Sequence, residues 1–425
     1  MYNLQDDLLK IEHDFDNIQF ADRDTLRIKY IDEFNPTGEY DGIKALTYDG
    51  LKYGDFNTKN FAYIGFPDDC KNKKVPAMVL VHGGGGYPFL QWIKEWNNRG
   101  YAAIAISTVG VFPKRINAGD NEAGINEDWD KKLCGVFEED GYKATPYNDD
   151  MFVRDSQPVN EMWMYHAVSQ TLLAGKVLET YDIIDIDKIG AVGISWGSII
   201  LSITLGYKNN FKYAIPVYGS GYLTESLSYM RYKFILPRAQ DLWLAEKRFN
   251  QVNIPVLWIC MNNDRCFSAN SNSKSYEDTV KNNSLTALSI KSGWMHAHVP
   301  CWDAEHFPCH EIYAFADAMV KESGFPSVTS QNVSNDGVLH CTFDGFEYGK
   351  VVATLYFLSE KYEYCIPQNI HESHLPHEWK TININVDFDN NAVAAQIPGG
   401  ASCYYLELKN PDKNITVTSK LYFSV

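Results

Sequence analysis

The serine at position 195 is the residue whose surroundings most clearly predict chemistry. It lies in the run 193–197, whose sequence is Gly-Ile-Ser-Trp-Gly and matches the pattern G-x-S-x-G. The apolar run 188–192 before it is typical of a buried strand, and residues 198–205 can continue as a helix. A strand, this pentapeptide and a helix form a nucleophile elbow, in which a sharp turn raises the serine Oγ above the sheet edge. The sequence therefore predicts that Ser195 is a nucleophile.

A glycine-rich turn upstream supplies a second part of such a site. The strand expected at 76–81 is followed by a histidine and four glycines, residues 82–86. Backbone N–H groups about 2.7–3.1 Å from a developing oxyanion stabilise it, and glycines leave their approach open. We assign one donor to Gly84 and the other to Trp196. The pattern itself does not show which of the glycines donates. A phosphate-binding loop would need Lys and Ser or Thr after the last glycine, where this chain has Tyr87.

An activated serine needs a base, and the base needs a carboxylate that orients it. In this arrangement the three residues follow in the order serine, acid, histidine. Asp264 is the first carboxylate after the strand expected at 255–261, and we assign it the role of the acid; its alternative role is that of a turn residue. His296 and His298 both follow the last expected strand, 285–290. We favour His296 as the base and place His298 in the substrate pocket, but the order of residues does not decide between them.

The same segment contains a set of potential metal ligands, which are His296, His298, Cys301, His306, Cys309 and His310. Structural zinc sites usually pair their ligands as C-x2-4-C and H-x3-5-H. His306 and His310 have the second spacing, but Pro308 lies between them, and the two cysteines are too far apart for a zinc knuckle. We therefore predict no metal site and no cofactor.

Length and charge limit the class of protein. At 425 residues the chain is long enough for two domains. Its net charge of −16 argues against nucleic acid and against an anionic membrane as partners. No apolar run has the length of a membrane span. The nine scattered cysteines and the acidic N-terminus predict a cytoplasmic protein, with secretion left open in case a signal peptide has been removed. A homo-oligomer is also left open.

The order of elements predicts an α/β protein with a mostly parallel sheet and flanking helices. Residues 1–40 are expected to form a helical lead-in, and residues 41–325 a catalytic domain of alternating strands and helices. Two insertions, at about 110–155 and 222–250, are expected to lie over the site. From 327 to 425, short strands between Asn, Asp, Gly and Pro turns predict an all-β, sandwich-like domain without catalytic residues.

Seven stretches together resemble one group of α/β-hydrolases, and they are 61–63, 75–86, 99–105, 163–168, 193–197, 215–219 and 296–298. The group consists of bacterial serine esterases called acetyl xylan esterase-like or dienelactone hydrolase-like, and it is similar to the prolyl oligopeptidase superfamily. Its members often carry a β-rich C-terminal segment. The resemblance implies the α/β-hydrolase fold, ester cleavage, and a triad of Ser195, Asp264 and His296.

Two departures from that group concern the shape of the pocket. Members often have a second glycine after the elbow, where this chain has Ser198. They often have an aspartate after the strand that ends at Ser107, where this chain has Thr108. Neither departure changes the three expected triad residues.

The favoured function is therefore a serine carboxylic-ester hydrolase that acts on a small-molecule or oligosaccharide ester, with carbohydrate deacetylation as the first candidate. An aromatic platform for sugar could be formed by Tyr87, Trp163, Trp196, Tyr218 and Trp294, although the same side chains suit a core equally well. A prolyl-oligopeptidase-type peptidase is the alternative enzyme, but the chain has no propeller repeat. A catalytically inactive carbohydrate-binding protein is the alternative of another class, and it is disfavoured because every triad role has a candidate.

Overall fold

The structure is a computed structural model that describes residues 3–68, 70, 73–110, 142–144, 157–234, 236–264, 266–294, 296–297, 309–362 and 377–424. The chain divides into two compact units. The first contains Met1–Lys212 and Leu236–Gln251, and the second contains Tyr213–Ile235 and Val252–Val425. Most of the insertion predicted at about 110–155 lies outside the described residues. None of the described helices combines the length and the apolar character that a membrane span requires.

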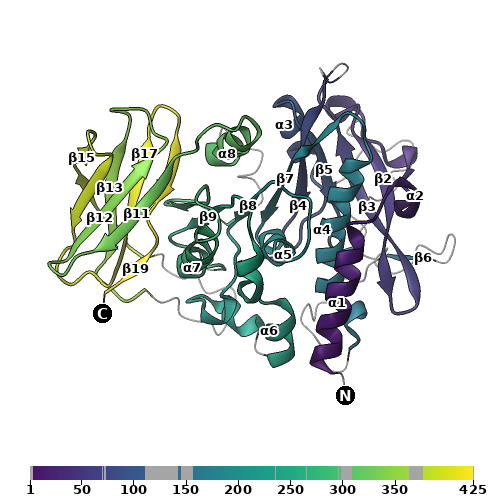
Figure 1. Cartoon of the computed structure of the whole chain (residues 1–425), viewed down its shortest axis with the longest axis horizontal. Coiled ribbons are helices and arrows are strands. Elements are labelled where there is room, and N and C mark those ends of the chain that lie inside the picture. Colours follow the sequence, from purple (N-terminus) through teal and green to yellow (C-terminus); the bar gives the residue numbers. More distant parts are fainter. Residues whose placement is uncertain are drawn as a thin grey trace. The chain divides into compact units, whose positions relative to one another are not determined.

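The first unit contains a sheet in the strand order β1-β2-β3-β5-β4-β7, with β6 beside β3 (Figure 1). Its strands are β1 (Lys29–Tyr30), β2 (Lys44–Tyr53), β3 (Phe56–Gly65), β4 (Val75–Val81), β5 (Ala102–Ile106), β6 (Tyr142–Ala144) and β7 (Ile184–Ile194). Its α-helices are α1 (Leu4–Ile18), α2 (Arg23–Leu26), α3 (Leu90–Asn98), α4 (Trp163–Glu179), α5 (Trp196–Thr204) and α6 (Pro237–Trp243). Short 3₁₀ helices are η1 (Asp32–Phe34), η2 (Gly38–Tyr40), η5 (Val159–Glu161) and η8 (Ala245–Gln251).

The strand β4 runs parallel to β5 and β7, whereas β2 and β3 are antiparallel. From Ala77 to Val81, β4 is fully buried. Such a continuous apolar run is typical of a parallel strand that is covered on both faces. Helix α3 packs against β3, β4 and β5, and α4 packs against β2, β4, β5 and β7.

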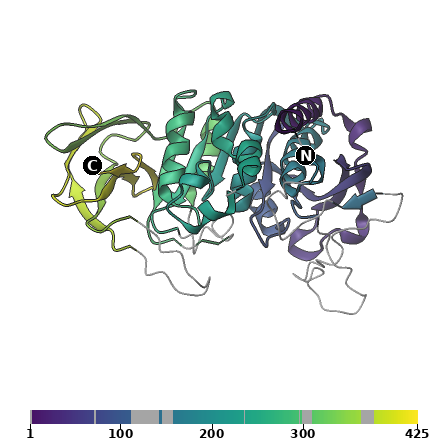
Figure 2. The ribbon, with the colours of Figure 1, turned by 90° about the horizontal axis from the view of Figure 1, so that it is seen from below.

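Helix α4 is buried on nearly all sides, which is the pattern of a helix enclosed by protein. It contacts the sheet and also α1, and Figure 2 shows these two helices stacked beside the strands. Helix α1 buries Asp7, Ile11 and Phe15, which recur at the spacing of one helix face. The ring of Phe15 packs 5.2 Å from that of Tyr165.

The second unit begins with the parallel strands β8 (Tyr213–Val217), β9 (Leu257–Met261) and β10 (Ala287–Lys291). Its helices are η6 (Leu223–Glu225), η7 (Tyr229–Phe234), α7 (Ala269–Val280) and α8 (His310–Val320). The segment predicted as a second insertion, 222–250, therefore forms η6, η7, α6 and η8, a series of short helices shared between the two units.

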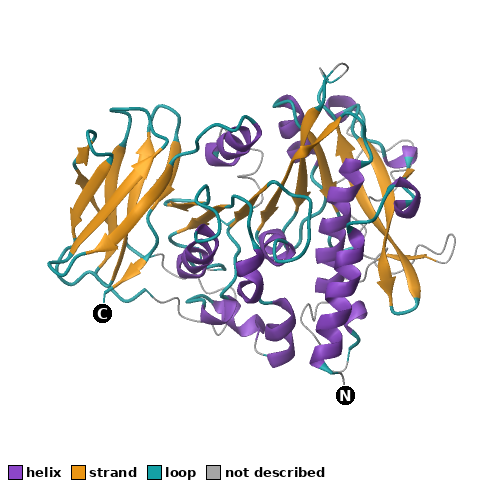
Figure 3. Cartoon of the chain, viewed as in Figure 1, coloured by secondary structure: helices purple, strands orange, loops and turns teal. Residues whose placement is uncertain are grey.

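From Ser327 onward the described residues form only strands and loops (Figure 3). One antiparallel sheet has the order β11-β12-β16-β15, and the other has the order β14-β13-β17-β18 with β19 beside β17. The strands are β11 (Ser327–Val333), β12 (Val338–Asp344), β13 (Val352–Leu358), β14 (Lys380–Ile384), β15 (Val386–Asp387), β16 (Ala392–Gln396), β17 (Cys403–Asn410), β18 (Ile415–Thr418) and β19 (Tyr422–Phe423). Buried residues alternate along β12 and β13, and the sheets touch where β11 meets β18 and β14 meets β16. The predicted fold class is confirmed: parallel strands with flanking helices are followed by an antiparallel β part.

The buried histidine His166 in α4 makes the stability of the protein depend on pH. Its Nε2 lies 2.9 Å from the carbonyl oxygen of Asn160, to which it donates, and the residue is 1% exposed. Burial lowers the pKa of His166 from 6.5 to about 4. The folded protein therefore keeps this imidazole neutral at pH values where the unfolded chain would protonate it.

Replacing His166 should remove this pH dependence. Because the folded pKa lies below the unfolded value, the contribution is present above pH 6.5 and is lost as the pH falls towards 4. The loss should reach about 3 kcal/mol. We expect the difference in unfolding free energy between the native chain and His166→Gln to narrow by that amount between pH 7 and pH 4 in urea titrations. A difference that stays constant over this interval would show that His166 does not titrate as described.

Candidate active site

Ser195 occupies a strained turn between a strand and a helix. Strand β7 ends at Ile194 and α5 begins at Trp196. The φ of 57° and ψ of −120° at Ser195 lie outside the regions that residues with a side chain ordinarily adopt. Its carbonyl oxygen accepts the N–H groups of Ser198 and Ile199 at 2.9 and 3.2 Å, so the strained residue also starts the helix. This is the geometry of a nucleophile elbow.

The two glycines that flank the elbow are required by close backbone contacts. A Cβ on Gly193 would lie 2.3 Å from the carbonyl oxygen of Gly197, and a Cβ on Gly197 would lie 2.0 Å from that of Val81. Distances below 3.0 Å essentially never occur for a real Cβ, so no side chain fits at either position. The turn therefore packs directly against the end of β4.

The glycine turn at 82–86 lies at the same end of the sheet, because Val81 pairs with Gly193 in the β4–β7 ladder. A Cβ on Gly84 would lie 2.6 Å from Cδ1 of the Trp196 side chain. The structure thus brings together the two residues that the sequence predicts as oxyanion donors. Gly85 has a φ of 71°, which a glycine adopts without strain.

His82 holds this turn in place and is a residue whose role the sequence did not predict. It is 1% exposed, and its Nδ1 lies 2.8 Å from the carbonyl oxygen of Gly83. Its Nε2 accepts the backbone N–H of Thr108 at 3.1 Å. The carbonyl oxygen of Thr108 in turn accepts the indole N–H of Trp163 at 2.6 Å. The only signal in the sequence was the position of His82 directly before the glycines.

Asp264 and His296 form a hydrogen-bonded pair in the second unit. The carboxylate Oδ2 lies 2.9 Å from Nδ1 of His296. The other carboxylate oxygen accepts the backbone N–H groups of Cys266 and Phe267 at 2.6 and 3.1 Å. Asp264 is fully buried, and these donors together with His296 satisfy both of its oxygens. The two roles considered for Asp264, turn residue and partner of the histidine, are therefore both present, one on each oxygen.

Aromatic side chains fix the imidazole of His296. Its ring centroid lies 4.7 Å from that of Tyr218 and 5.7 Å from that of Phe267. The hydroxyl of Tyr218 donates to the carbonyl oxygen of Ala297 at 2.5 Å. Because Nδ1–H donates to Asp264, Nε2 is the nitrogen that can accept a proton. His298, the alternative base, lies outside the described residues.

Comparison with known proteins gives similarity in fold alone. No family model and no curated protein sequence matches the chain. The acetyl xylan esterase from Paenibacillus sp. R4 is 15% identical over 72% of this chain and 94% of its own, with a TM-score of 0.48. Acetyl xylan esterase 1 from Thermoanaerobacterium sp. JW/SL YS485 is 12% identical over 73% of this chain and 98% of its own, with a TM-score of 0.46.

A solved acylaminoacyl peptidase from Pyrococcus horikoshii is 15% identical over 67% of this chain, with a TM-score of 0.45. The match spans 43% of the length of that peptidase. At such identities the assignment of the fold rests on features of this chain, namely the parallel strands, the elbow after β7 and the glycine turn after β4. The chain has the α/β-hydrolase fold.

The side chains predicted to form a sugar platform differ in exposure within this hydrolase fold. Trp163 and Tyr218 are 4% and 0% exposed, and they pack against Trp196 and His296 respectively. Tyr87 and Trp294 are half-buried. The structure thus favours a packing role for the first two and leaves the last two accessible to a ligand.

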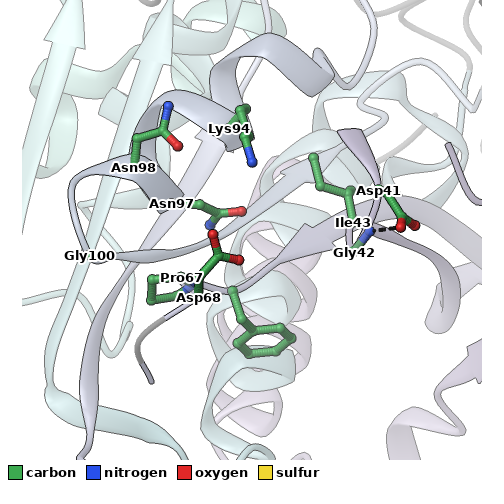
Figure 4. Close-up of a pocket in the computed structure, with 10 residues that line it drawn as sticks. Asp41, Gly42, Ile43, Pro67, Asp68, Lys94, Asn97, Asn98 and Gly100 are labelled. Carbon is green, nitrogen blue, oxygen red and sulfur yellow. Dashed lines mark hydrogen bonds between the residues drawn. The ribbon is translucent and has the colours of Figure 1, made fainter. Parts of the chain in front are cut away.

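The first unit also has a polar pocket, which Figure 4 shows. Its volume is about 450 Å³, and its lining includes Asp41, Asp68, Lys94, Asn97 and Asn98. Asp68 lies in the connection that leads into β4, and the two asparagines end α3. The pocket is therefore at the beginning of β4, whereas the glycine turn follows the end of the same strand.

A buried ion pair fixes the start of the loop that carries His296. Lys291, the last residue of β10, donates to Oε1 of Glu311 in α8 at 2.5 Å. Glu311 is fully buried, and the same oxygen accepts the backbone N–H of Thr416 in β18 at 2.7 Å. The carbonyl oxygen of Lys291 accepts the N–H of Asn262 at 3.0 Å. The beginnings of the acid loop and the histidine loop are thus joined.

Removing one partner of this pair should destabilise the protein strongly. We expect Lys291→Met to lower the free energy of unfolding by about 3–5 kcal/mol, because it leaves the Glu311 carboxylate buried without its cation. The double variant Lys291→Met with Glu311→Gln should recover more than half of the loss, since it removes the charge and keeps an acceptor for Thr416. Urea unfolding of the three proteins at pH 7 measures both values. A double variant no more stable than the single one would contradict this account.

Proposed function

We propose that this chain is a serine hydrolase that cleaves carboxylic esters through an acyl-enzyme on Ser195. The observation that carries the proposal is the strained backbone of Ser195 between two obligatory glycines. Backbone strain is retained where a function needs it, and a serine raised on such a turn is suited to attack a carbonyl. Ser195 belongs to the first unit and the pair Asp264–His296 to the second, so their cooperation is part of the proposal.

In the proposed reaction, Asp264 holds the His296 tautomer that carries its proton on Nδ1. Nε2 then takes the proton of the Ser195 hydroxyl as Oγ bonds to the ester carbonyl carbon. The carbonyl oxygen becomes an oxyanion that accepts the N–H groups of Trp196 and Gly84. Collapse of this intermediate breaks the bond to the leaving alcohol, which receives the proton from Nε2. Water then attacks the acyl-enzyme, with His296 again accepting and returning the proton. This step releases the carboxylic acid product and frees Ser195.

We further propose a carbohydrate ester, with an acetyl group as the first candidate acyl group. The half-buried Tyr87 and Trp294 support it, because they follow the glycine turn and β10 and because sugar rings stack on aromatic side chains. Part of each ring is already in contact, since the Lys291 ammonium lies 5.1 Å from the centre of the Trp294 ring and the centre of the Phe89 ring lies 4.4 Å from that of Tyr87. A peptidase is the second candidate activity, since the same residues can cleave an amide. Turnover of acetylated xylan compared with that of aminoacyl arylamides distinguishes the two. An inactive carbohydrate-binding protein would turn over neither these substrates nor p-nitrophenyl acetate.

Replacement of the nucleophile should abolish turnover and leave the fold intact. We expect Ser195→Ala to lower kcat for p-nitrophenyl acetate about 10⁴-fold or more, as triad substitutions do. A matched control is Ser202→Ala, which removes another buried hydroxyl of α5 whose hydrogen bond is to the carbonyl oxygen of Ser198. The control should retain kcat within a few-fold. Ester turnover by Ser195→Ala above about a tenth of the native value would exclude Ser195 as the nucleophile.

The same assay decides which histidine is the base. His296→Ala should match the loss seen in Ser195→Ala, whereas His298→Ala should mainly raise KM. The reverse order of severity would assign the base to His298. Circular dichroism of every variant separates a loss of chemistry from a loss of fold.

A further inference from the structure

A carboxylate, a thiol and an imidazole converge beside the proposed base. Asp264, Cys266 and His296 each offer one ligand atom, and these three atoms lie within 4.8 Å of one another. All three residues belong to the second unit. Asp264 is buried, whereas Cys266 and His296 are partly exposed. The cluster is therefore only partly enclosed.

The types of these ligands select a particular class of metal. Thiolate and imidazole nitrogen bind Zn²⁺, with bond lengths of about 2.3 and 2.0–2.1 Å, and a carboxylate oxygen binds it at about 2.0–2.2 Å. Mg²⁺ and Ca²⁺ prefer oxygen ligands and reject the thiolate. Ligands of a tetrahedral zinc ion lie about 3.5 Å apart, as these bond lengths require. Nδ1 of His296 and Oδ2 of Asp264, which are 2.9 Å apart, would separate slightly on binding, and ligand atoms up to 4.8 Å apart would approach one another.

The ligands are also held by their neighbours in the way metal ligands usually are. The second oxygen of Asp264 is fixed by the N–H groups of Cys266 and Phe267. The imidazole of His296 packs between Tyr218 and Phe267. Supporting contacts of this kind orient ligands and strengthen metal binding.

We propose that Asp264, Cys266 and His296 form an inhibitory zinc site. Zn²⁺ would bind Nδ1 of His296, Oδ2 of Asp264 and the Cys266 thiolate, with water as a fourth ligand. The thiol proton leaves to solvent, and the imidazole proton moves from Nδ1 to Nε2. An Nε2 that carries a proton cannot accept the proton of the serine hydroxyl. Zinc binding would therefore prevent His296 from acting as the base. This inhibition rests on the proposed function, whereas the zinc binding does not.

Zinc binding is tested first without reference to activity. The full chain, stripped of metal with EDTA, is titrated with ZnCl₂ in a calorimeter. We expect one zinc per chain and at least a tenfold weaker affinity in Cys266→Ser. The matched control is Cys70→Ser, because Cys70 is also partly exposed and lies in the first unit. Co²⁺ in place of Zn²⁺ should give a thiolate charge-transfer band that is present in the control and lost in Cys266→Ser.

The activity assay then tests inhibition. Zinc should suppress p-nitrophenyl acetate turnover by the native chain and by Cys70→Ser, and EDTA should restore it. The activity of each variant with zinc is compared with its own activity without zinc. Inhibition of Cys266→Ser should need a zinc concentration at least tenfold higher than inhibition of the native chain. One-to-one binding through Cys266 in a chain without esterase activity would reject the proposed function and keep the metal site. Equal zinc affinity in Cys266→Ser would reject the site and assign zinc to other ligands, such as those in 298–308.

A different observation concerns the loop that leads to Asp264. The side-chain amide of Asn262 donates to the hydroxyl of Tyr405 in β17 at 3.1 Å, and the hydroxyl of Tyr362 lies 3.4 Å from the carbonyl oxygen of Asn262. The side chain of Asn263 exchanges two hydrogen bonds of 3.1 Å with the backbone of His377. The C-terminal β part therefore holds both residues that precede the acid.

The contacts of Asn262 with the two tyrosines are buried. Asn262 and Tyr405 are fully buried, and Tyr362 is 2% exposed. Burial raises the pKa of Tyr405 well above its ordinary value, so its hydroxyl remains protonated. Its ring stacks on that of Tyr356 in β13, with centroids 4.9 Å apart and planes inclined by 5°. A buried polar group left without its partner is destabilising, so these hydrogen bonds hold the loop firmly.

We infer that Tyr405 is a positioning residue for Asp264 and that the C-terminal β part contributes to catalysis through it. The inference rests on the proposed function, in which Asp264 orients His296. Small displacements of a catalytic group can lower a rate by as much as about 100-fold. The effect of the β part is therefore expected in kcat rather than in substrate affinity.

The test compares Tyr405→Phe with Tyr404→Phe, which removes the neighbouring hydroxyl from the same strand. We expect kcat to fall about tenfold in Tyr405→Phe with KM unchanged, and to stay within about twofold in the control, as a tenfold change is only about 1.4 kcal/mol of barrier. A purely structural role would lower the melting temperature and leave kcat at 25 °C intact, which would overturn the inference.

A readout that needs no turnover distinguishes failure of this inference from failure of the proposed function. The proton on Nδ1 of His296 is hydrogen-bonded to a carboxylate and should give a downfield NMR signal. That signal should shift or broaden in Tyr405→Phe and not in Tyr404→Phe. An unchanged signal together with unchanged kcat rejects the positioning role, whereas a shifted signal in a chain without esterase activity rejects the function alone.

Discussion

The close approach of three backbone segments around Ser195 is the constraint on which the candidate site depends. Gly197 leaves no room for a Cβ against Val81, and Gly193 leaves none against Gly197. The end of β4, the end of β7 and the start of α5 are therefore locked at one point. The glycine turn follows directly from this point, so its N–H groups and the serine hydroxyl are placed by the same contact. A side chain at either glycine would displace Ser195 and the glycine turn together.

The pair of oxygens on Asp264 solves a second problem, that of satisfying a buried carboxyl group while directing it at His296. One oxygen is satisfied by the backbone of the following turn, and the other is directed at His296. Because the turn fixes one oxygen, the direction of the other is determined. The same turn carries Cys266 into the neighbourhood of the imidazole, so this short loop sets both the hydrogen-bond partner and the surroundings of His296.

Much of the fold and of the candidate site could be predicted from the sequence, because local patterns carry them. The elbow is a pentapeptide between a strand and a helix, and Asp264 and His296 follow strand ends in the order that the fold requires. The roles of the aromatic side chains were harder to predict, since Trp163 and Tyr218 suit a core and a binding surface equally. Only their burial in the structure separates these two roles. The contact between Asn262 and Tyr405 spans 143 positions along the chain and has no local pattern that predicts it.

The first helix has a consequence for how the chain acquires its structure during synthesis. Helix α1 is synthesised well before Arg238, yet the carboxylate of Asp7 is paired with Arg238, which lies 231 positions later, at 2.7 Å. Between them the chain leaves the first unit at Lys212 and returns to it at Leu236. The first unit cannot close before part of the second has been made. Ordering such distant segments is slow, because the entropy of the intervening chain is lost before their contact forms. Until Arg238 has been made, Asp7 lacks the cation with which it pairs, although α4, which packs against α1, has already been synthesised.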